Sequence, residues 1–150
     1  MDAVTYPDDK VAGFLLEHFI PLRVRFDAKP LAVEFGIRWT PNLITLDSEG
    51  KDHYGVLGYV SPQEFIPTFL VGLSVGQFDL NKFDEAIANL DRLLSDYPKS
   101  FAAPEAMYYR AVSLFKKTHE GGHLKTVYAE LQKMYPTSKW AERAYPYSRL

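Results

Sequence analysis

The stretch Leu93-Leu94-Ser95-Asp96-Tyr97-Pro98-Lys99-Ser100 decides the fold of the second half of the chain, because it occurs twice. Its second copy, Leu131-Gln132-Lys133-Met134-Tyr135-Pro136-Thr137-Ser138, lies at an offset of 38 residues. In each copy the Tyr-Pro pair ends a helical pattern, since proline cannot continue a helix and disfavours the helical conformation in the residue before it. Two alanines that follow, Ala103 and Ala106, recur at the same offset and allow the next helix to pack closely. The repeat therefore predicts an array of helical hairpins.

Apolar residues at helical spacing predict four helices after about residue 77, over residues 82–97, 104–117, 123–135 and 138–147. The offset of the repeat is close to the period of about 34 residues of a tetratricopeptide repeat. Together with Ala103-Pro104-Glu105-Ala106-Met107-Tyr108-Tyr109, the pattern resembles the tetratricopeptide-like helices attached to some bacterial thioredoxin-related proteins. Two helix pairs are fewer than the three usually needed for independent stability, so we expect them to pack on the first half of the chain.

The first half of the chain mixes helical and strand patterns. A helix is expected to open at Asp8 or Asp9, either of which can cap it, and a short helix is expected over residues 29–35. Apolar residues that alternate with polar ones, or that form a short run between turn residues, predict strands over residues 20–26, 42–46 and 51–57.

A capping box opens the last helix of this half. Ser61-Pro62-Gln63-Glu64 offers a capping serine, a proline at the first helical position and a glutamate at the third. We expect this helix to end within Gly72-Leu73-Ser74-Val75-Gly76, which would make a domain boundary. The expected domains are residues 1–73 and residues 77–150.

The order of the elements in the first half resembles the thioredoxin fold from its active-site helix onward. Phe35-Gly36-Ile37-Arg38-Trp39-Thr40-Pro41-Asn42-Leu43 looks like the family's segment around its cis-proline, and Asp47-Ser48-Glu49-Gly50 looks like its hairpin turn. Residues 1–19 look like the helix that follows the family's Cys-x-x-Cys. The resemblance covers about half of the chain. It implies an α/β region, a partial thioredoxin-like fold of about three strands over residues 1–73, followed by an all-α region of two tetratricopeptide-like hairpins over residues 77–150.

The chain contains no cysteine, and this limits its chemistry. Thiol–disulfide exchange needs a thiolate that attacks and a second sulfur that resolves the mixed disulfide, so this chain cannot carry out that reaction. We expect a non-catalytic binding module for protein–protein interaction. The alternative is that the chain is the C-terminal remainder of a thiol–disulfide oxidoreductase whose Cys-x-x-Cys lies upstream of Met1.

The strand that precedes Cys-x-x-Cys in thioredoxins is missing here, so the strand expected over residues 20–26 lacks its usual neighbour. Unpaired strand edges attract other strands. Three outcomes are open at this point. The natural chain begins further upstream, a homodimer completes the sheet, or the strand pairs within a reduced sheet of three strands.

One candidate for peptide binding follows from the thioredoxin resemblance. The resemblance implies a cis bond between Thr40 and Pro41, with the backbone before the proline pairing with an extended peptide. Trp39 would then line a peptide groove. A large side chain packed at a turn is the competing interpretation of Trp39.

A second candidate lies in the helical half. Tetratricopeptide-like helices present a concave face, and tyrosine offers rigid, amphipathic contacts at low entropic cost. We therefore consider Tyr108, Tyr109 and Tyr128 as residues of a binding face. Aromatic packing between the helices is the competing interpretation.

Composition and charge argue against several classes of function. The chain has 17 Lys plus Arg against 19 Asp plus Glu, without the clustered basic charge of a nucleic-acid-binding protein. No apolar run approaches the roughly 20 residues of a membrane span. The acidic and polar N-terminus is no signal peptide, so the sequence as written predicts a cytoplasmic protein, and the compartment is open if the natural N-terminus lies upstream. No phosphate-binding loop is present, and we expect no cofactor.

The histidines give little reason to expect metal binding or catalysis. His119 and His123 are four residues apart, but Gly121-Gly122 breaks the helix between them, so we expect no metal site. His18 and His53 are expected to be structural or solvated. The sequence has no nucleophile elbow or other catalytic signature, and we expect no catalytic residue.

Overall fold

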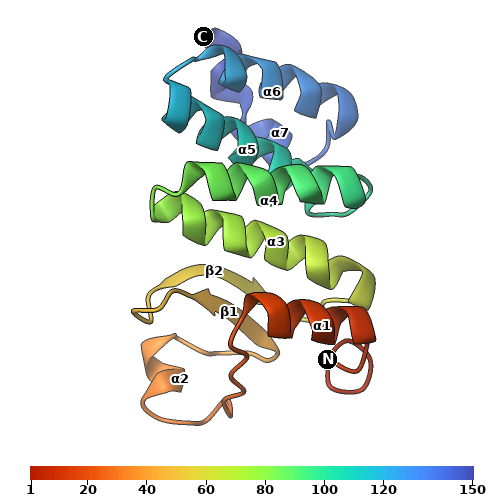
Figure 1. Ribbon diagram of the computed structural model, residues 1–150, viewed down its shortest axis with the longest axis vertical. Helices are drawn as coiled ribbons and strands as arrows, with labels where there is room; N and C mark the ends of the chain where they lie inside the picture. Colours follow the sequence, from red (N-terminus) through yellow and green to blue (C-terminus); the bar gives the residue numbers. More distant parts are fainter. The chain divides into compact units, whose positions relative to one another are not determined.

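The computed structural model describes all 150 residues, Met1–Leu150. They form two compact units, Met1–Ile66 and Pro67–Leu150. Seven α-helices, one 3-10 helix and one two-stranded sheet make up the chain, as Figure 1 shows in the order of the sequence. The chain is therefore mostly helical, and its small sheet belongs to the first unit.

The first unit begins with a helix that is capped as the sequence predicts, α1 (Asp9–His18). The Asp8 carboxylate accepts hydrogen bonds from the backbone N–H groups of Lys10 and Val11 at 3.0 and 3.1 Å. These bonds satisfy two donors that a helix leaves without a partner at its start. The expected short helix is also present as α2 (Leu31–Glu34).

The sheet of the first unit pairs β1 (Asn42–Leu46) with β2 (Asp52–Leu57) in an antiparallel hairpin. These are two of the three expected strands. Leu43 lies opposite Val56 in the register of the pair. Since the sheet has only two strands, each strand keeps one edge without a strand neighbour.

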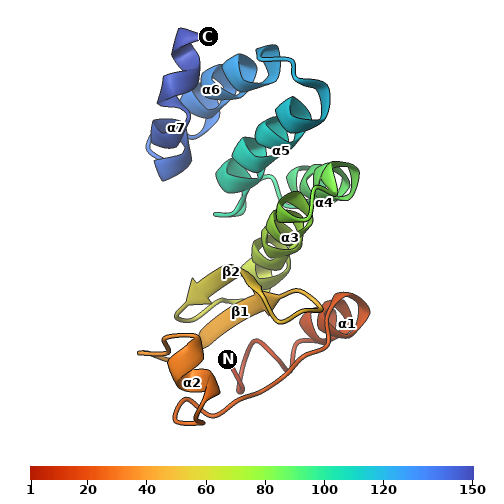
Figure 2. The ribbon, with the colours of Figure 1, turned by 90° about the vertical axis from the view of Figure 1, so that its left-hand side faces the viewer.

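The third expected strand, over residues 20–26, does not form, and that prediction is wrong. Figure 2 shows the segment between α1 and α2 as a plain tube. A strand needs a neighbour for its backbone N–H and C=O groups, and the backbone of residues 20–24 makes no hydrogen bond within the chain. The two-stranded sheet therefore does not support the expected thioredoxin-like fold of about three strands.

The helix that follows the sheet, α3 (Pro62–Asp79), begins at the expected capping box but runs on through Gly72 and Gly76. The prediction that these glycines end the helix is wrong. A glycine inside a helix costs roughly 1 kcal/mol relative to alanine. Val71 and Val75 on the same stretch are buried, and full burial of such a side chain contributes about 1.5–3 kcal/mol. Packing of the helix therefore outweighs the cost of its glycines.

The second unit is helical throughout. It contains α4 (Phe83–Asp96), α5 (Ala103–Thr118), α6 (Gly122–Met134), α7 (Lys139–Arg143) and a 3-10 helix, Tyr145–Arg149. α4 packs on α5, α5 packs on α6, and α7 packs on both α5 and α6. The first three of these helices confirm the sequence prediction. The fourth expected helix, over residues 138–147, ends early because Pro146 cannot donate the backbone hydrogen bond that an α-helix needs there.

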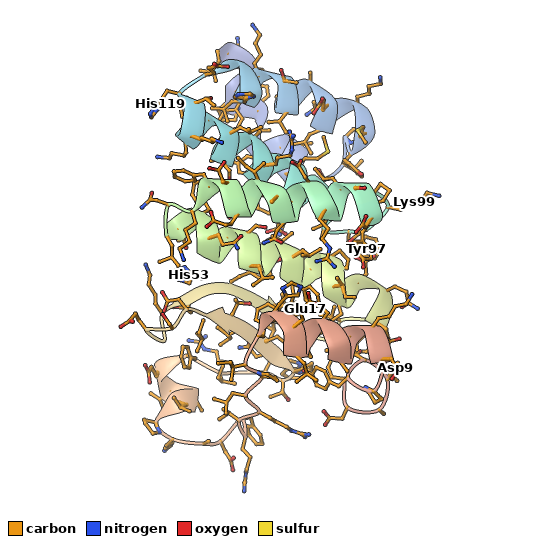
Figure 3. The ribbon with its side chains drawn as sticks, in the orientation of Figure 1. Asp9, Glu17, His53, Tyr97, Lys99 and His119 are labelled. Atoms are coloured by element: carbon orange, nitrogen blue, oxygen red, sulfur yellow. The ribbon has the colours of Figure 1, made fainter.

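The sequence repeat corresponds to a repeated backbone geometry. α4 and α6 each end at a tyrosine, with φ and ψ of −131° and 49° at Tyr97 and of −138° and 54° at Tyr135. Each tyrosine N–H donates to the carbonyl of the leucine four residues earlier at 2.8 Å. Ser100 and Ser138 then donate their N–H groups to the tyrosine carbonyls, both at 3.0 Å. Figure 3 labels Tyr97 where α4 ends. The predicted repeat is confirmed.

One cluster of the core of the second unit lies between α5, α6 and α7. The buried residues of this cluster are Met107, Ala111, Leu124, Val127, Leu131, Trp140, Ala141 and Ala144. Ala103 and its counterpart in the repeat, Ala141, are both fully buried. The close helix packing that the repeated alanines predict is therefore present.

Candidate peptide-binding surface

An aromatic cluster joins three helices of the second unit. The rings of Tyr108 and Tyr109 on α5 lie 5.1 and 5.5 Å from the ring of Trp140 on α7, measured between centroids. Tyr109 also meets Phe78 on α3, with centroids 6.3 Å apart in an edge-to-face arrangement. Aromatic pairs in such geometries are worth about 0.5–1.5 kcal/mol each beyond the area that they bury. We call Phe78, Tyr108, Tyr109, Trp140 and Tyr147 the aromatic cluster.

Tyr108 uses its side chain to hold the C-terminal segment of the chain. Its ring stacks on that of Tyr147, with centroids 5.9 Å apart and planes inclined by 22°. The two hydroxyl groups share a hydrogen bond of 2.9 Å. Burial raises the pKa of Tyr147 well above its usual value, and the hydrogen bond with Tyr108 raises it further. Both contacts are internal, so Tyr108 acts mainly in packing.

Tyr109 occupies a different position in the cluster, at the point where α3, α5 and α7 meet. Its side chain is half-buried. Burial raises the pKa of Tyr109, the nearby Glu105 carboxylate raises it further, and the Arg143 guanidinium opposes them. The phenol therefore stays protonated at neutral pH and can donate a hydrogen bond to a ligand.

The third tyrosine candidate, Tyr128, lies apart from the cluster. It is on α6, and its ring meets that of Tyr145 at 6.2 Å between centroids. The structure therefore brings together two of the three candidate tyrosines and leaves out the third.

Trp140 is a central member of the cluster that the sequence analysis missed. It is only 4% exposed, with Lys139 and Arg143 placed 5.2 and 4.9 Å from its ring centroid. The Ser138 side chain accepts a hydrogen bond from the N–H of Ala141 at 3.1 Å and starts the short helix that carries Trp140. The sequence repeat could have predicted that Trp140 is buried, because the 38-residue offset relates it to Ala102, which is also buried.

A groove of about 400 Å³ lies between α4, α5 and α6 of the same unit. Leu94, Met107 and Leu114 contribute apolar lining, and the lining also contains charged residues. Two of these, Asp91 and Arg110, form an ion pair between α4 and α5. None of the three candidate tyrosines lines this groove, which the sequence analysis did not predict.

The candidate loop Trp39-Thr40-Pro41 belongs to the first unit and forms a separate candidate. The Thr40–Pro41 bond is cis, the isomer that the family resemblance implies. Trp39 is 69% exposed and is not packed at the turn. The Pro41 carbonyl accepts a hydrogen bond from the N–H of Gly58 at 2.8 Å, which joins the loop to the end of the hairpin.

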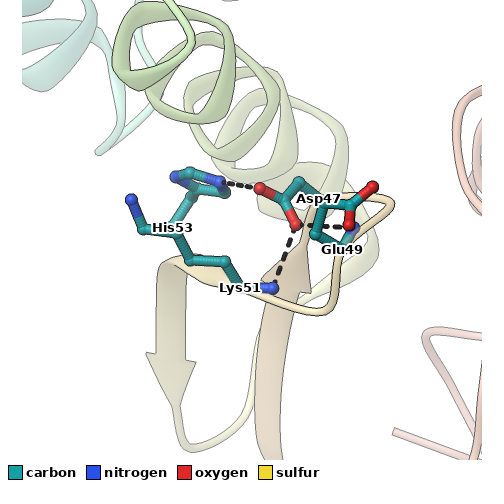
Figure 4. Close-up of polar contacts among 4 residues, drawn as sticks. All are labelled: Asp47, Glu49, Lys51 and His53. Carbon is teal, nitrogen blue, oxygen red and sulfur yellow. Dashed lines mark hydrogen bonds and ion pairs between the residues drawn. The ribbon is translucent and has the colours of Figure 1, made fainter.

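A polar network supports the hairpin turn, as Figure 4 shows. The Asp47 carboxylate accepts hydrogen bonds from the N–H groups of Glu49 and Lys51 at 2.9 and 3.0 Å and lies 2.9 Å from Nε2 of His53. The side chain of His53 is only 1% exposed. The hydrogen bond with His53 lowers the pKa of Asp47, and the two backbone donors lower it further. These hydrogen bonds fix the turn. Because the His53 imidazole is almost inaccessible to solvent, it is poorly placed to transfer a proton to a ligand.

The remaining histidines do not gather into a metal site. His119 ends α5 in the left-handed conformation and is exposed, as its label in Figure 3 shows, whereas His123 lies 3.7 Å from Glu120. No group of three or more histidine, cysteine, aspartate or glutamate side chains is placed to hold a metal ion. None of the helices combines the length and the apolar character that a membrane crossing requires.

The comparisons with known proteins agree with the helical geometry. Residues 70–100 match the family model of the tetratricopeptide repeat, and this segment covers the end of α3, all of α4 and the turn before α5. No curated protein and no solved structure matches the chain. The match makes α3 and α4 the first hairpin, so the 38-residue offset makes α5 and α6 the second. Our expected pairing of helices began one helix too late. The segment of residues 70–100 is thus similar to a tetratricopeptide repeat, and the helical part of this chain is tetratricopeptide-like.

Proposed function

We propose that the second unit is a protein–protein interaction module that binds a peptide segment of a partner and performs no catalysis itself. Tetratricopeptide repeats typically mediate protein interactions, and residues 70–100 match that family. The observation that carries the proposal is the position of Tyr109. It lies where α3, α5 and α7, the first helices of successive hairpins, come together.

The surroundings of Tyr109 define the chemistry of the peptide. The half-buried ring offers an apolar face, and its protonated hydroxyl offers a hydrogen-bond donor. Glu105 and Arg143, which both act on its pKa, place one negative and one positive charge nearby. A peptide with an apolar anchor and a backbone carbonyl or polar side chain beside it fits this position.

The experiment that tests this function is peptide selection on the full chain, followed by affinity measurement on two variants. We expect Tyr109→Ala to weaken binding of the selected peptides at least tenfold, because an aromatic anchor at the centre of an interface typically carries 2 kcal/mol or more. Tyr128→Ala is the matched control, since Tyr128 lies outside the cluster, and we expect it to bind as the parent does. Equal losses in both variants, or selection of no peptide, would contradict the proposal.

A second peptide contact is proposed at Trp39-Thr40-Pro41 in the first unit. The observation that favours it is the 69% exposure of Trp39, which is unusual for so large an apolar ring.

We also propose that the first unit is a thioredoxin-like domain. The support for this assignment is the order of its elements, which is helix, short helix, hairpin and capped helix. No observation supports the alternative of an oxidoreductase.

Self-association through the first unit is a further proposal. Most of the large apolar side chains that remain exposed belong to Met1–Ile66. The most exposed of these in the first unit are Ile20 at 97% and Leu22 at 79%. Extended apolar surface of this kind marks interaction sites. A homodimer would cover it.

A further inference from the structure

Residues 20–26 have the alternating apolar pattern of a β-strand but do not form one in the structure. Ile20, Leu22, Val24 and Phe26 stand at alternate positions and are 97%, 79%, 44% and 67% exposed. Successive side chains of a strand point to opposite sides, so these four residues would share one side once the segment is paired as a strand. Monomeric proteins rarely leave such a continuous apolar side uncovered.

The backbone of the same segment shows what kind of partner it needs. Residues 20–24 make no backbone hydrogen bond within the chain. A helix satisfies its own backbone groups and cannot supply these bonds, whereas an added strand supplies both the hydrogen bonds and the apolar contacts. The partner of this segment is therefore another extended strand.

We propose that this strand is the same segment of a second copy, paired antiparallel with Leu22 opposite Leu22. This inference deepens the self-association proposed above and names its surface. Each copy brings an identical unpaired segment, so one two-fold interface covers both. Four side chains that each leave on the order of 100 Å² uncovered expose on the order of 800 Å² in the two copies together. Strand pairing places them side by side on one face, so that each side chain is covered in part by its cross-strand neighbours.

The charges disfavour two other registers that keep the apolar residues on one side. A pairing centred on residue 23 would place Arg23 opposite Arg23, and one centred on residue 24 would place Arg23 opposite Arg25. Like charges directly opposite each other destabilise a strand pair. A pairing centred on Leu22 places Arg23 opposite Pro21 and avoids both conflicts.

Pro21 is also compatible with the pairing centred on Leu22. If Leu22 forms the hydrogen-bonded pair with its counterpart, residues 20, 22 and 24 direct their backbone groups to the partner strand. Pro21 then directs its nitrogen, which carries no hydrogen, away from the partner. The register that suits the arginines therefore also suits the proline.

The absence of cysteine makes a direct test simple, because one introduced cysteine is the only thiol of the chain. Leu22→Cys should give a disulfide-linked dimer under mild oxidation, since Cα atoms of a hydrogen-bonded pair lie about 5.5 Å apart, within disulfide range. Leu16→Cys, which is equally exposed at 74% but lies on α1, should stay largely monomeric. Arg23→Cys tests the register, because the proposed pairing does not place residue 23 opposite itself.

Sedimentation of the unmodified full chain is measured beside the cross-linking, with Val24→Pro as the variant that removes one backbone donor of the pair. We expect a dimer for the parent chain, at least a tenfold weaker dimer for Val24→Pro, and efficient cross-linking of Leu22→Cys alone. A dimer that cross-links equally through all three cysteines, or that Val24→Pro leaves unchanged, would overturn the named surface but not self-association. A monomer at all concentrations would overturn both.

Discussion

Tyr108 and Tyr109 are neighbours in the sequence with different roles, because successive side chains of a helix are turned by about 100° around its axis. Tyr108 is turned toward Tyr147 and shares a 2.9 Å hydrogen bond with it, whereas Tyr109 is turned toward Phe78 of α3. The first is a packing residue and the second is the candidate for ligand contact. The packing interpretation therefore holds for Tyr108, and Tyr109 is the residue for which we propose ligand contact.

The hydroxyl pair predicts a non-additive double-mutant cycle. Tyr108→Phe and Tyr147→Phe should each lower the free energy of unfolding by about 0.5–1.5 kcal/mol, because each removes the same hydrogen bond and keeps the ring. The double variant should lose no more than the larger single loss. Urea unfolding of the full chain measures all four proteins, and fully additive losses would show that the two hydroxyls act independently.

The same pair predicts a loss of stability at alkaline pH. The pKa of Tyr147 is raised in the folded protein, so its contribution is complete below the unfolded pKa of about 10 and is lost as the pH rises above it. Tyr147→Phe removes this titration. We expect the parent chain to lose more stability than Tyr147→Phe between about pH 9.5 and pH 11, and parallel curves would contradict this role.

Asp47 predicts the opposite behaviour in acid. Its pKa is lowered in the folded protein by His53 and by two backbone N–H donors. A carboxylate of this kind contributes stability that is present above its unfolded pKa, near 4, and is lost as the pH falls through the lower folded pKa. Asp47→Asn should therefore show a weaker loss of stability below about pH 4 than the parent chain. Hydrogen exchange at the Glu49 and Lys51 amides measures this locally, and identical acid profiles would contradict it.

At the scale of elements, local sequence signals predicted the hairpin and most of the helices, and non-local packing explains the errors in the strand over residues 20–26 and at the end of α3. Asp8 caps α1, and the Tyr-Pro pairs end α4 and α6, because these signals act within a few residues. The strand over residues 20–26 failed because a strand depends on a neighbour that the sequence pattern does not contain. α3 passes through its glycines because buried residues stabilise it, which no local signal reveals.

The cap of α7 provides a test at this scale. Ser138→Ala should destabilise the chain by about 0.5–2 kcal/mol, because the Ser138 side chain accepts the Ala141 N–H bond that starts the helix. The neighbouring exposed Thr137→Ala is the matched control and should change stability by less than about 0.5 kcal/mol. Thermal unfolding compares the two, and equal effects would mean that the cap does not hold α7.

At the scale of the whole molecule, the two units differ in how completely they bury their apolar residues. The second unit has a closed core between its helices, which the repeat in the sequence predicted. The first unit leaves the apolar side chains of residues 20–26 exposed and the backbone of residues 20–24 without hydrogen bonds within the chain. This accounts for the failed strand prediction and motivates the proposed second copy. The candidate site was predicted in part, since Tyr108 and Tyr109 lie together, but Trp140 and Phe78 come from distant positions that only the fold assembles.

The most direct test of the central claim is hydrogen–deuterium exchange of the full chain with and without a peptide selected on it. Binding at the aromatic cluster should slow exchange in α3, α5 and α7 around Tyr109, and it should leave α6 around Tyr128 unchanged. Protection confined to α6, or to the first unit, would contradict the claim that the second unit binds peptides at Tyr109.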